Sequence, residues 1–104
     1  MANPMRGEVE IVLDGQPHIA RLTLGALAQL EARLAEGSLA DLVRRLEEGR
    51  FSSGDIVAVL VAGLRGGGWV GCADDLLEQQ IEGGPLAGAR AAAQLIALAF
   101  RDVA

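Results

Sequence analysis

Apolar side chains occupy every second position from Val9 to Leu13, with Glu8, Glu10 and Val12 on the other face, and this pattern predicts a β-strand with one buried face. The expected buried side chains are Val9, Ile11 and Leu13. Asp14-Gly15 follows, and both residues tolerate the positive φ that a tight hairpin turn needs. The matching face of a second strand is formed by His18, Ala20 and Leu22. The pattern therefore predicts an antiparallel β-hairpin within residues 5–23.

The loop of this hairpin can have two or four residues, because both lengths leave the same side chains on the apolar face. The four-residue loop is favoured because it removes Pro17, which has no N–H, from the ladder. It also places Glu10 opposite Arg21, which is a favourable cross-strand pair. We therefore expect the longer loop.

Helical periodicity replaces the alternation after Thr23, which is suited to cap a first helix. The apolar stripe of that helix is Leu27, Leu30 and Leu34. Gly37 is its expected stop. Two S-x-x-D boxes, Ser38–Asp41 and Ser52–Asp55, predict the starts of a second and a third helix. On the second helix we expect an ion pair between Asp41 and Arg45, which are four residues apart.

Residues 56–64 are apolar nearly all round, and their β-branched side chains would also suit a buried strand. The start box and the length before Gly66 favour a helix, in which Gly63 would allow a close approach of a neighbour. The glycines of residues 66–71 predict a loop. A short polar helix is expected over residues 73–81.

The last helix is predicted over residues 86–103, after a Gly-Gly-Pro break. Its apolar face includes Ala92, Leu95, Ile96 and Phe100. The expected fold is α+β: an N-terminal antiparallel β-hairpin packed on a small bundle of four to five α-helices. We expect one domain over residues 1–104, with the hairpin in residues 5–23 and the helices in 24–104.

Composition narrows the classes of function. The chain has 104 residues, a formal net charge of −5, nine basic residues that are all arginine, and a single cysteine. The acidic balance argues against nucleic-acid binding, which needs a basic face. Without an N-terminal apolar run, and with no apolar run long enough to cross a bilayer, we expect no membrane association and a cytoplasmic protein in the producing cell.

No catalytic, cofactor or metal site is predicted. Residues 66–71 match G-x-G-x-x-G, but a dinucleotide site needs a strand before that motif and another strand beyond it. His18 is expected as a partly exposed strand residue, and Cys72 as a free, partly packed thiol without an activating neighbour. The carboxylate pairs Asp74-Asp75 and Glu47-Glu48 are expected to be solvated. The chain is therefore not expected to be an enzyme.

Protein binding is the chemistry that remains. Trp69 lies in the glycine loop, where its ring either tucks into the core or anchors a protein contact. The apolar third and last helices either pack on each other or leave a surface on which a partner helix could dock. The candidate partner-binding residues are Trp69, Leu95, Ile96 and Phe100.

The chain resembles the gene transfer agent and phage-tail proteins of α-proteobacteria. The resemblance rests on Arg6-Gly-Glu-Val, on Asp14-Gly15, and on the run from Arg21 to Glu31. It continues through GRFSSGDIVAVLVAGLRGGG at residues 49–68 and the Ala/Leu-rich C-terminal helix, spanning residues 5–100. Residues 69–80 add nothing to it.

This resemblance implies a non-enzymatic role in tail morphogenesis. One implied role is that of a tail assembly chaperone, which binds the long helical tape-measure protein before the tail tube polymerises. Such a chaperone would self-associate along the tape-measure protein. The other is a structural tail tube component that stays in the particle. The partners implied are the tape-measure or other tail proteins, and further copies of the chain.

Overall fold

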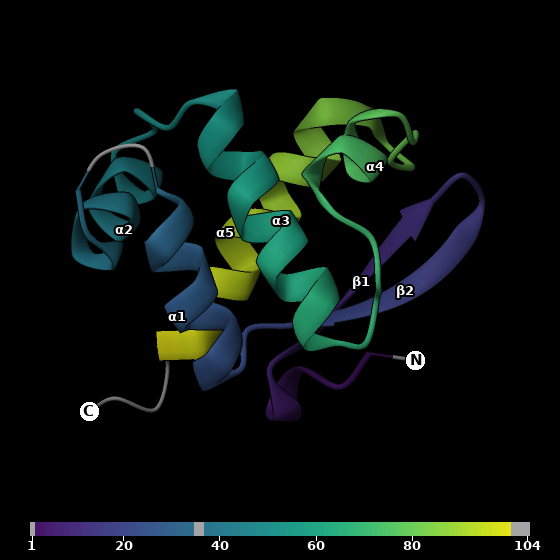
Figure 1. The fold of residues 1–104 in the computed structure, drawn as a ribbon, viewed down its shortest axis with the longest axis horizontal. Helices are drawn as coiled ribbons and strands as arrows, with labels where there is room; N and C mark the ends of the chain where they lie inside the picture. Colours follow the sequence, from purple (N-terminus) through teal and green to yellow (C-terminus); the bar gives the residue numbers. More distant parts are fainter. Residues whose placement is uncertain (1, 35–36, 101–104) are drawn as a thin grey trace.

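The computed structural model describes residues 2–34 and 37–100. A 3₁₀ turn, η1 (Pro4–Arg6), precedes two strands, β1 (Glu8–Leu13) and β2 (Gln16–Arg21). The α-helices that follow in the described residues are α1 (Leu24–Arg33), α2 (Leu39–Glu47), α3 (Ser53–Gly66), α4 (Ala73–Leu77) and α5 (Gly84–Phe100). The expected α+β fold, with a hairpin on a small set of helices, is confirmed (Figure 1).

The hairpin closes through a two-residue loop, so the expected four-residue loop is wrong. Leu13 pairs with Gln16, and the two loop residues Asp14 and Gly15 have φ values of 50° and 79°. Positive φ at both positions is what a type I′ turn requires, and this turn matches the twist of the strands. The shorter loop places Arg21 opposite Glu8 rather than opposite Glu10.

Pro17 fits this register because the ladder does not use its backbone nitrogen. Pro17 lies opposite Val12, next to the Leu13–Gln16 pair that closes the turn. Antiparallel pairs alternate between hydrogen-bonded and non-hydrogen-bonded, so the Val12–Pro17 pair is of the second kind. The Pro17 nitrogen therefore points away from β1, and no ladder bond is lost.

The apolar face of the hairpin packs against α3 and α5. The buried side chains on β1 are Val9, Ile11 and Leu13. On the same face, Ala20 of β2 and Leu22, just after β2, are also buried. Helix α3 is the centre of the molecule, since it contacts β2, α1 and α5 (Figure 1). A Cβ atom added to Gly63 would lie 2.7 Å from Leu95 Cδ1, which confirms that this glycine permits the close α3–α5 packing.

The expected starts of α1 to α4 are confirmed, whereas α5 begins at Gly84, inside the expected Gly-Gly-Pro break and two residues before Leu86. Thr23 Oγ1 accepts a hydrogen bond from Ala26 N at 3.0 Å, and Ser38 and Ser52 each form a capping box. The ends agree less well. Helix α1 stops at Arg33, one turn before Gly37, and α4 stops at Leu77 although a helix through Ile81 was expected. Residues 101–103 of the expected last helix lie outside the described residues.

Helix α4 ends early because residues 80–82 pair with the outer edge of β1. Asp14 N donates to Gln80 O at 2.8 Å, and Gln80 N donates to Asp14 Oδ1 at 2.9 Å. Glu82 N donates to Val12 O at 2.9 Å, and Ile81 forms a β-bridge with Leu13. These bonds hold the segment between α4 and α5 against the hairpin.

An ion pair joins α2 to α3. Arg45 donates through Nε and Nη2 to the two carboxylate oxygens of Asp55, at 3.0 and 2.9 Å, and the two side chains are only 28% and 12% exposed. The expected ion pair between Asp41 and Arg45 on α2 does not form; Asp41 instead forms an ion pair with Arg44, at 3.8 Å. The bidentate pair fixes the geometry of the α2–α3 connection.

We predict that Asp55→Asn destabilises the protein by roughly 2 kcal/mol at neutral pH, because a charge-assisted pair and part of a helix cap are lost. The hydrogen bond from Arg45 is the main reason why the pKa of Asp55 lies below its usual value. A lowered pKa in the folded state stabilises the fold above the unfolded pKa, and this stabilisation is lost as pH falls through the folded pKa.

Thermal melting of both proteins from pH 7 to pH 3 checks this. The deficit of Asp55→Asn should shrink below about pH 4, near the unfolded pKa of aspartate. Asp41→Asn is the matched control: Asp41 also completes a capping box, but its ion pair with Arg44 is long and exposed, so a smaller deficit is expected. A deficit for Asp55→Asn that does not depend on pH would contradict the assignment.

Candidate functional site

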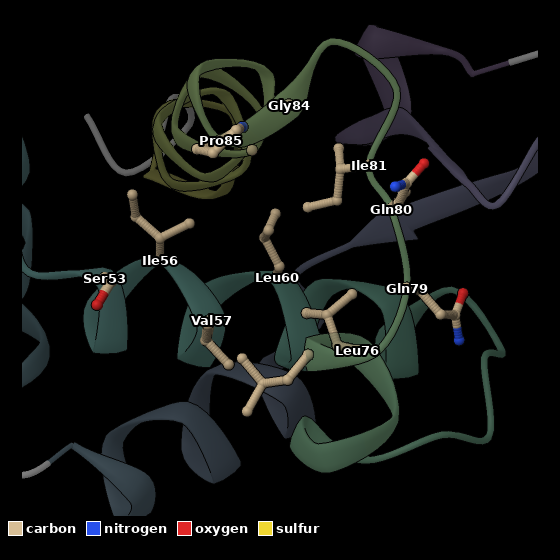
Figure 2. A pocket seen from close by; sticks show the side chains of 12 residues that line it. Ser53, Ile56, Val57, Leu60, Leu76, Gln79, Gln80, Ile81, Gly84 and Pro85 are labelled. Atoms are coloured by element: carbon tan, nitrogen blue, oxygen red, sulfur yellow. The ribbon is translucent and has the colours of Figure 1, made fainter.

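An open apolar groove lies between α3, α4 and the start of α5. Its volume is about 610 Å³. Figure 2 shows the side chains of Ile56, Leu60 and Ile81 directed toward the space that Pro85 faces from α5. The full lining consists of Ser53, Ile56, Val57, Leu60, Leu76, Leu77, Gln79, Gln80, Ile81, Gly84, Pro85 and Gly88.

Three separate pieces of local structure build this groove. Helix α3 contributes Ile56 and Leu60, which are four residues apart and therefore lie on one helical face. Ile81 belongs to the segment that hydrogen bonds hold against β1, as described above. Gly88 keeps the α5 wall low, since a Cβ atom there would lie 3.3 Å from Ile81 Cδ1 and 3.5 Å from Leu60 Cδ1. The groove thus depends on the tertiary fold.

The floor of the groove belongs to the core, whereas its margin is exposed. Leu60 and Leu76 are 1% and 4% exposed, but the lining residue Leu77 is 66% exposed. The polar lining residues are Ser53, Gln79 and Gln80. A carboxylate, imidazole or thiol is not among the lining residues, so the groove offers an apolar surface for binding and no group for acid–base chemistry.

The four candidate partner-binding residues do not form one surface. Leu95 and Ile96 are 0% and 5% exposed, which places them in the core and makes them unavailable to a partner of the folded chain. Phe100, near the end of α5, is 37% exposed. Trp69 is half-buried against the core, and its ring covers Gly71 so closely that a Cβ atom there would overlap it.

The groove residues were not predicted as a site. The available signal was the apolar character of residues 56–64 all round the helix, which is more than one buried face requires. That signal led to two alternatives, packing of the third and last helices or a docking surface. In the structure, the C-terminal half of α3 packs on α5 at Gly63, which confirms the first alternative. Its N-terminal half lines the groove, and the use of this groove as a docking surface stays a prediction.

The G-x-G-x-x-G motif has a packing role at its first glycine. Cβ atoms on Gly66 and Gly67 would collide with the carbonyl oxygens of Arg21 and Ile19 on β2. The end of α3 therefore approaches the edge of the hairpin as closely as backbone allows. The motif follows a helix, α3, whereas a dinucleotide site requires a strand at that place.

The remaining candidates for catalysis or metal binding do not line the groove. His18 is half-exposed on β2, as expected, and the carboxylates of Asp74-Asp75 and Glu47-Glu48 are exposed. Cys72 is a free thiol, but it is exposed rather than partly packed, because it occupies the cap position of α4. Among the described residues, His, Cys, Asp and Glu side chains form no group of three that could hold a metal.

Two comparisons find no relative. The search of curated proteins and the search of solved structures both return no match to this chain. In residues 2–34 and 37–100, no helix combines the length and apolar character needed to cross a bilayer.

A third comparison identifies the family. A family model described as phage tail tube protein, GTA-gp10, matches residues 6–102, which is nearly the whole chain. The match includes the hairpin, every helix described above and the groove. It agrees with the resemblance that the hairpin and residues 49–68 carry in the sequence. The chain therefore belongs to the GTA-gp10 family of phage tail proteins and has a structural or morphogenetic role in tails.

Proposed function

We propose that this protein is a tail assembly chaperone, which binds apolar helical segments of the tape-measure protein before the tail tube polymerises around it. The observation that carries this proposal is the apolar groove, whose lining residue Leu77 is largely exposed. Exposed apolar surface that is continuous with a cavity is typical of sites for protein or ligand binding. A groove between helices suits a helical client in particular.

The proposal requires no catalytic group in the groove. A chaperone masks apolar surface and needs no nucleophile, general base or metal. The overall acidic charge, with a net charge of −5, keeps such a protein soluble while part of its surface is apolar. Binding and release of a client then depend on competition with the tube subunits that replace the chaperone.

Co-expression with the tape-measure protein of the same tail gene cluster tests the proposal. We expect a complex that survives size-exclusion chromatography and a larger soluble fraction of the tape-measure protein. Leu77→Ser, at the exposed margin of the groove, should weaken both effects. Val70→Ser is the matched control, because Val70 is 93% exposed and belongs to the loop before α4, outside the groove lining. No complex and no gain in solubility would overturn the proposal.

A second candidate function is a tube component that remains in the particle. The description of the family as tail tube proteins favours this candidate. Mass spectrometry of purified particles separates the two functions, because a tube component is present at a stoichiometry comparable to other tail subunits, whereas a chaperone is absent.

A further inference from the structure

The groove is bordered by negative charge. Between Arg65 and Arg90 the sequence has no basic residue and four acidic ones. All four are exposed. Asp75 accepts a hydrogen bond from the backbone N–H of Cys72 and so caps α4, which leaves Asp74, Glu78 and Glu82. Within the described part of the chain, none of these three carboxylates takes part in an ion pair.

Two of these three carboxylates belong to the α4 wall of the groove. Glu78 stands between the lining residues Leu77 and Gln79, whereas Glu82, which follows Ile81, lines a second cavity with Glu10 and Val12. Asp74 precedes Leu77 by three residues on α4, which places the two side chains on neighbouring positions of the helix surface. The segment that forms one wall of the groove therefore carries the negative charge of this region.

From this arrangement we infer that the groove takes one amphipathic helix whose apolar stripe is flanked by lysine or arginine. The inference rests on the proposed function, since it states which helical segments of a client the chaperone binds. On α3 the lining residues extend from Ser53 to Leu60, a rise of about 10 Å, or two helical turns. The client then contributes apolar side chains spaced i, i+3 or i+4, and i+7.

A helix fits this surface better than a small apolar molecule. A small ligand would fill the floor over Leu60 and Ile81 but would leave Leu77, at the margin, exposed to water. A helix also places its flanking side chains at the height of the margin, where basic groups can reach Asp74 and Glu78. The carboxylates then select among apolar helices, which the apolar floor alone cannot do.

Two synthetic peptides of about 20 residues, long enough to form helix in water, test the inference. Both carry the same Leu/Ile stripe; one has flanking lysines and the other flanking glutamates. Fluorescence anisotropy of the labelled peptides measures their binding to the full chain. We expect the lysine peptide to bind roughly fivefold to tenfold more tightly at low salt, the combined effect of several exposed ion pairs. The preference should shrink at high salt, where the pairs are screened.

Four variants locate the effect. The double variant Asp74→Asn, Glu78→Gln should bind the two peptides with similar affinity. Leu77→Ser should weaken both, and Val70→Ser should weaken neither. Gly88→Met should also weaken both, because Gly88 is buried beside Ile81 and Leu60 and the larger side chain displaces these groove residues; circular dichroism of the variant checks that its helices are kept.

The outcomes separate the inference from the proposed function. Equal binding of the two peptides by the unmodified chain, or binding that Leu77→Ser and Gly88→Met leave unchanged, would overturn the inference. The inference would also be overturned, in favour of a small apolar ligand, if a small aliphatic alcohol displaced the lysine peptide and the two peptides bound equally well. If the peptides discriminate as expected but the tape-measure protein forms no complex, the inference stands and the proposed chaperone function fails.

Discussion

Leu30→Asp should unfold most of the protein or lower its melting temperature by roughly 16 °C or more, equivalent to about 4 kcal/mol. Leu30 is 0% exposed on α1, and the core around it is entirely apolar, since no polar or charged residue among those described is buried. A carboxylate at this position would have neither water nor a cation to stabilise it. Because a domain of this size has only about 5–15 kcal/mol of stability, this loss is a large fraction of the total.

Leu24→Asp is the control for this prediction, because it makes the same chemical change on the same helix. Leu24 is 85% exposed and is the first residue of α1, after the cap at Thr23. A carboxylate in the first turn interacts favourably with the helix dipole, by about 0.3–1 kcal/mol. Circular dichroism melts should therefore separate the two variants widely. Similar melting temperatures for Leu30→Asp and the unmodified chain would show that the buried face of α1 is assigned wrongly.

The face of each element could be predicted from the sequence, because it depends on periodicity alone. The apolar alternation of residues 8–13 gave the buried side of the hairpin, and it holds for either even loop length. The loop length itself depends on which way the Pro17 nitrogen points, and that follows from the register rather than from composition. The prediction gave weight to the missing N–H without knowing whether the ladder used that position.

Long-range hydrogen bonds set the features that the sequence missed. Residues 78–81 have a polar helical pattern, but Gln80 is bonded to Asp14, which is 66 positions away, so the helix stops at Leu77. Arg45 likewise pairs with Asp55 on the next helix. Local propensity gives no information on such partners, because its range is a few residues.

The position of the groove could not be predicted from the sequence. The apolar excess of the third and last helices indicated a docking surface, which stays a prediction, and two of the three residues chosen from the last helix, Leu95 and Ile96, are core residues. The groove needs the extended segment at Ile81, which exists only because α4 ends early. A single-helix pattern cannot reveal a surface that three elements form together.

Gly67→Ala should destabilise the protein by about 3 kcal/mol, although alanine is ordinarily the better helix former. The φ of Gly67 is −92°, which any residue adopts, so the cost does not arise from backbone conformation. It arises because the added Cβ collides with the carbonyl oxygen of Ile19, a backbone atom of β2 that cannot rotate away. The end of α3 would have to move off the hairpin, and the buried contact of Ala20 with α3 would open.

Gly54→Ala is the control, since Gly54 is exposed in the first turn of α3 and a Cβ there meets only Ser52 Oγ, at 3.6 Å. It should leave the melting temperature unchanged or raise it slightly. The comparison also decides how the glycine loop is to be understood. A dinucleotide fingerprint would require Gly66, Gly68 and Gly71 and would tolerate alanine at Gly67, which is a variable position of that motif. Close packing on β2 instead requires Gly66 and Gly67 together. If Gly67→Ala melts like the unmodified chain, the close contact between α3 and the hairpin edge is wrong; if it melts well below Gly54→Ala, the glycines serve the fold.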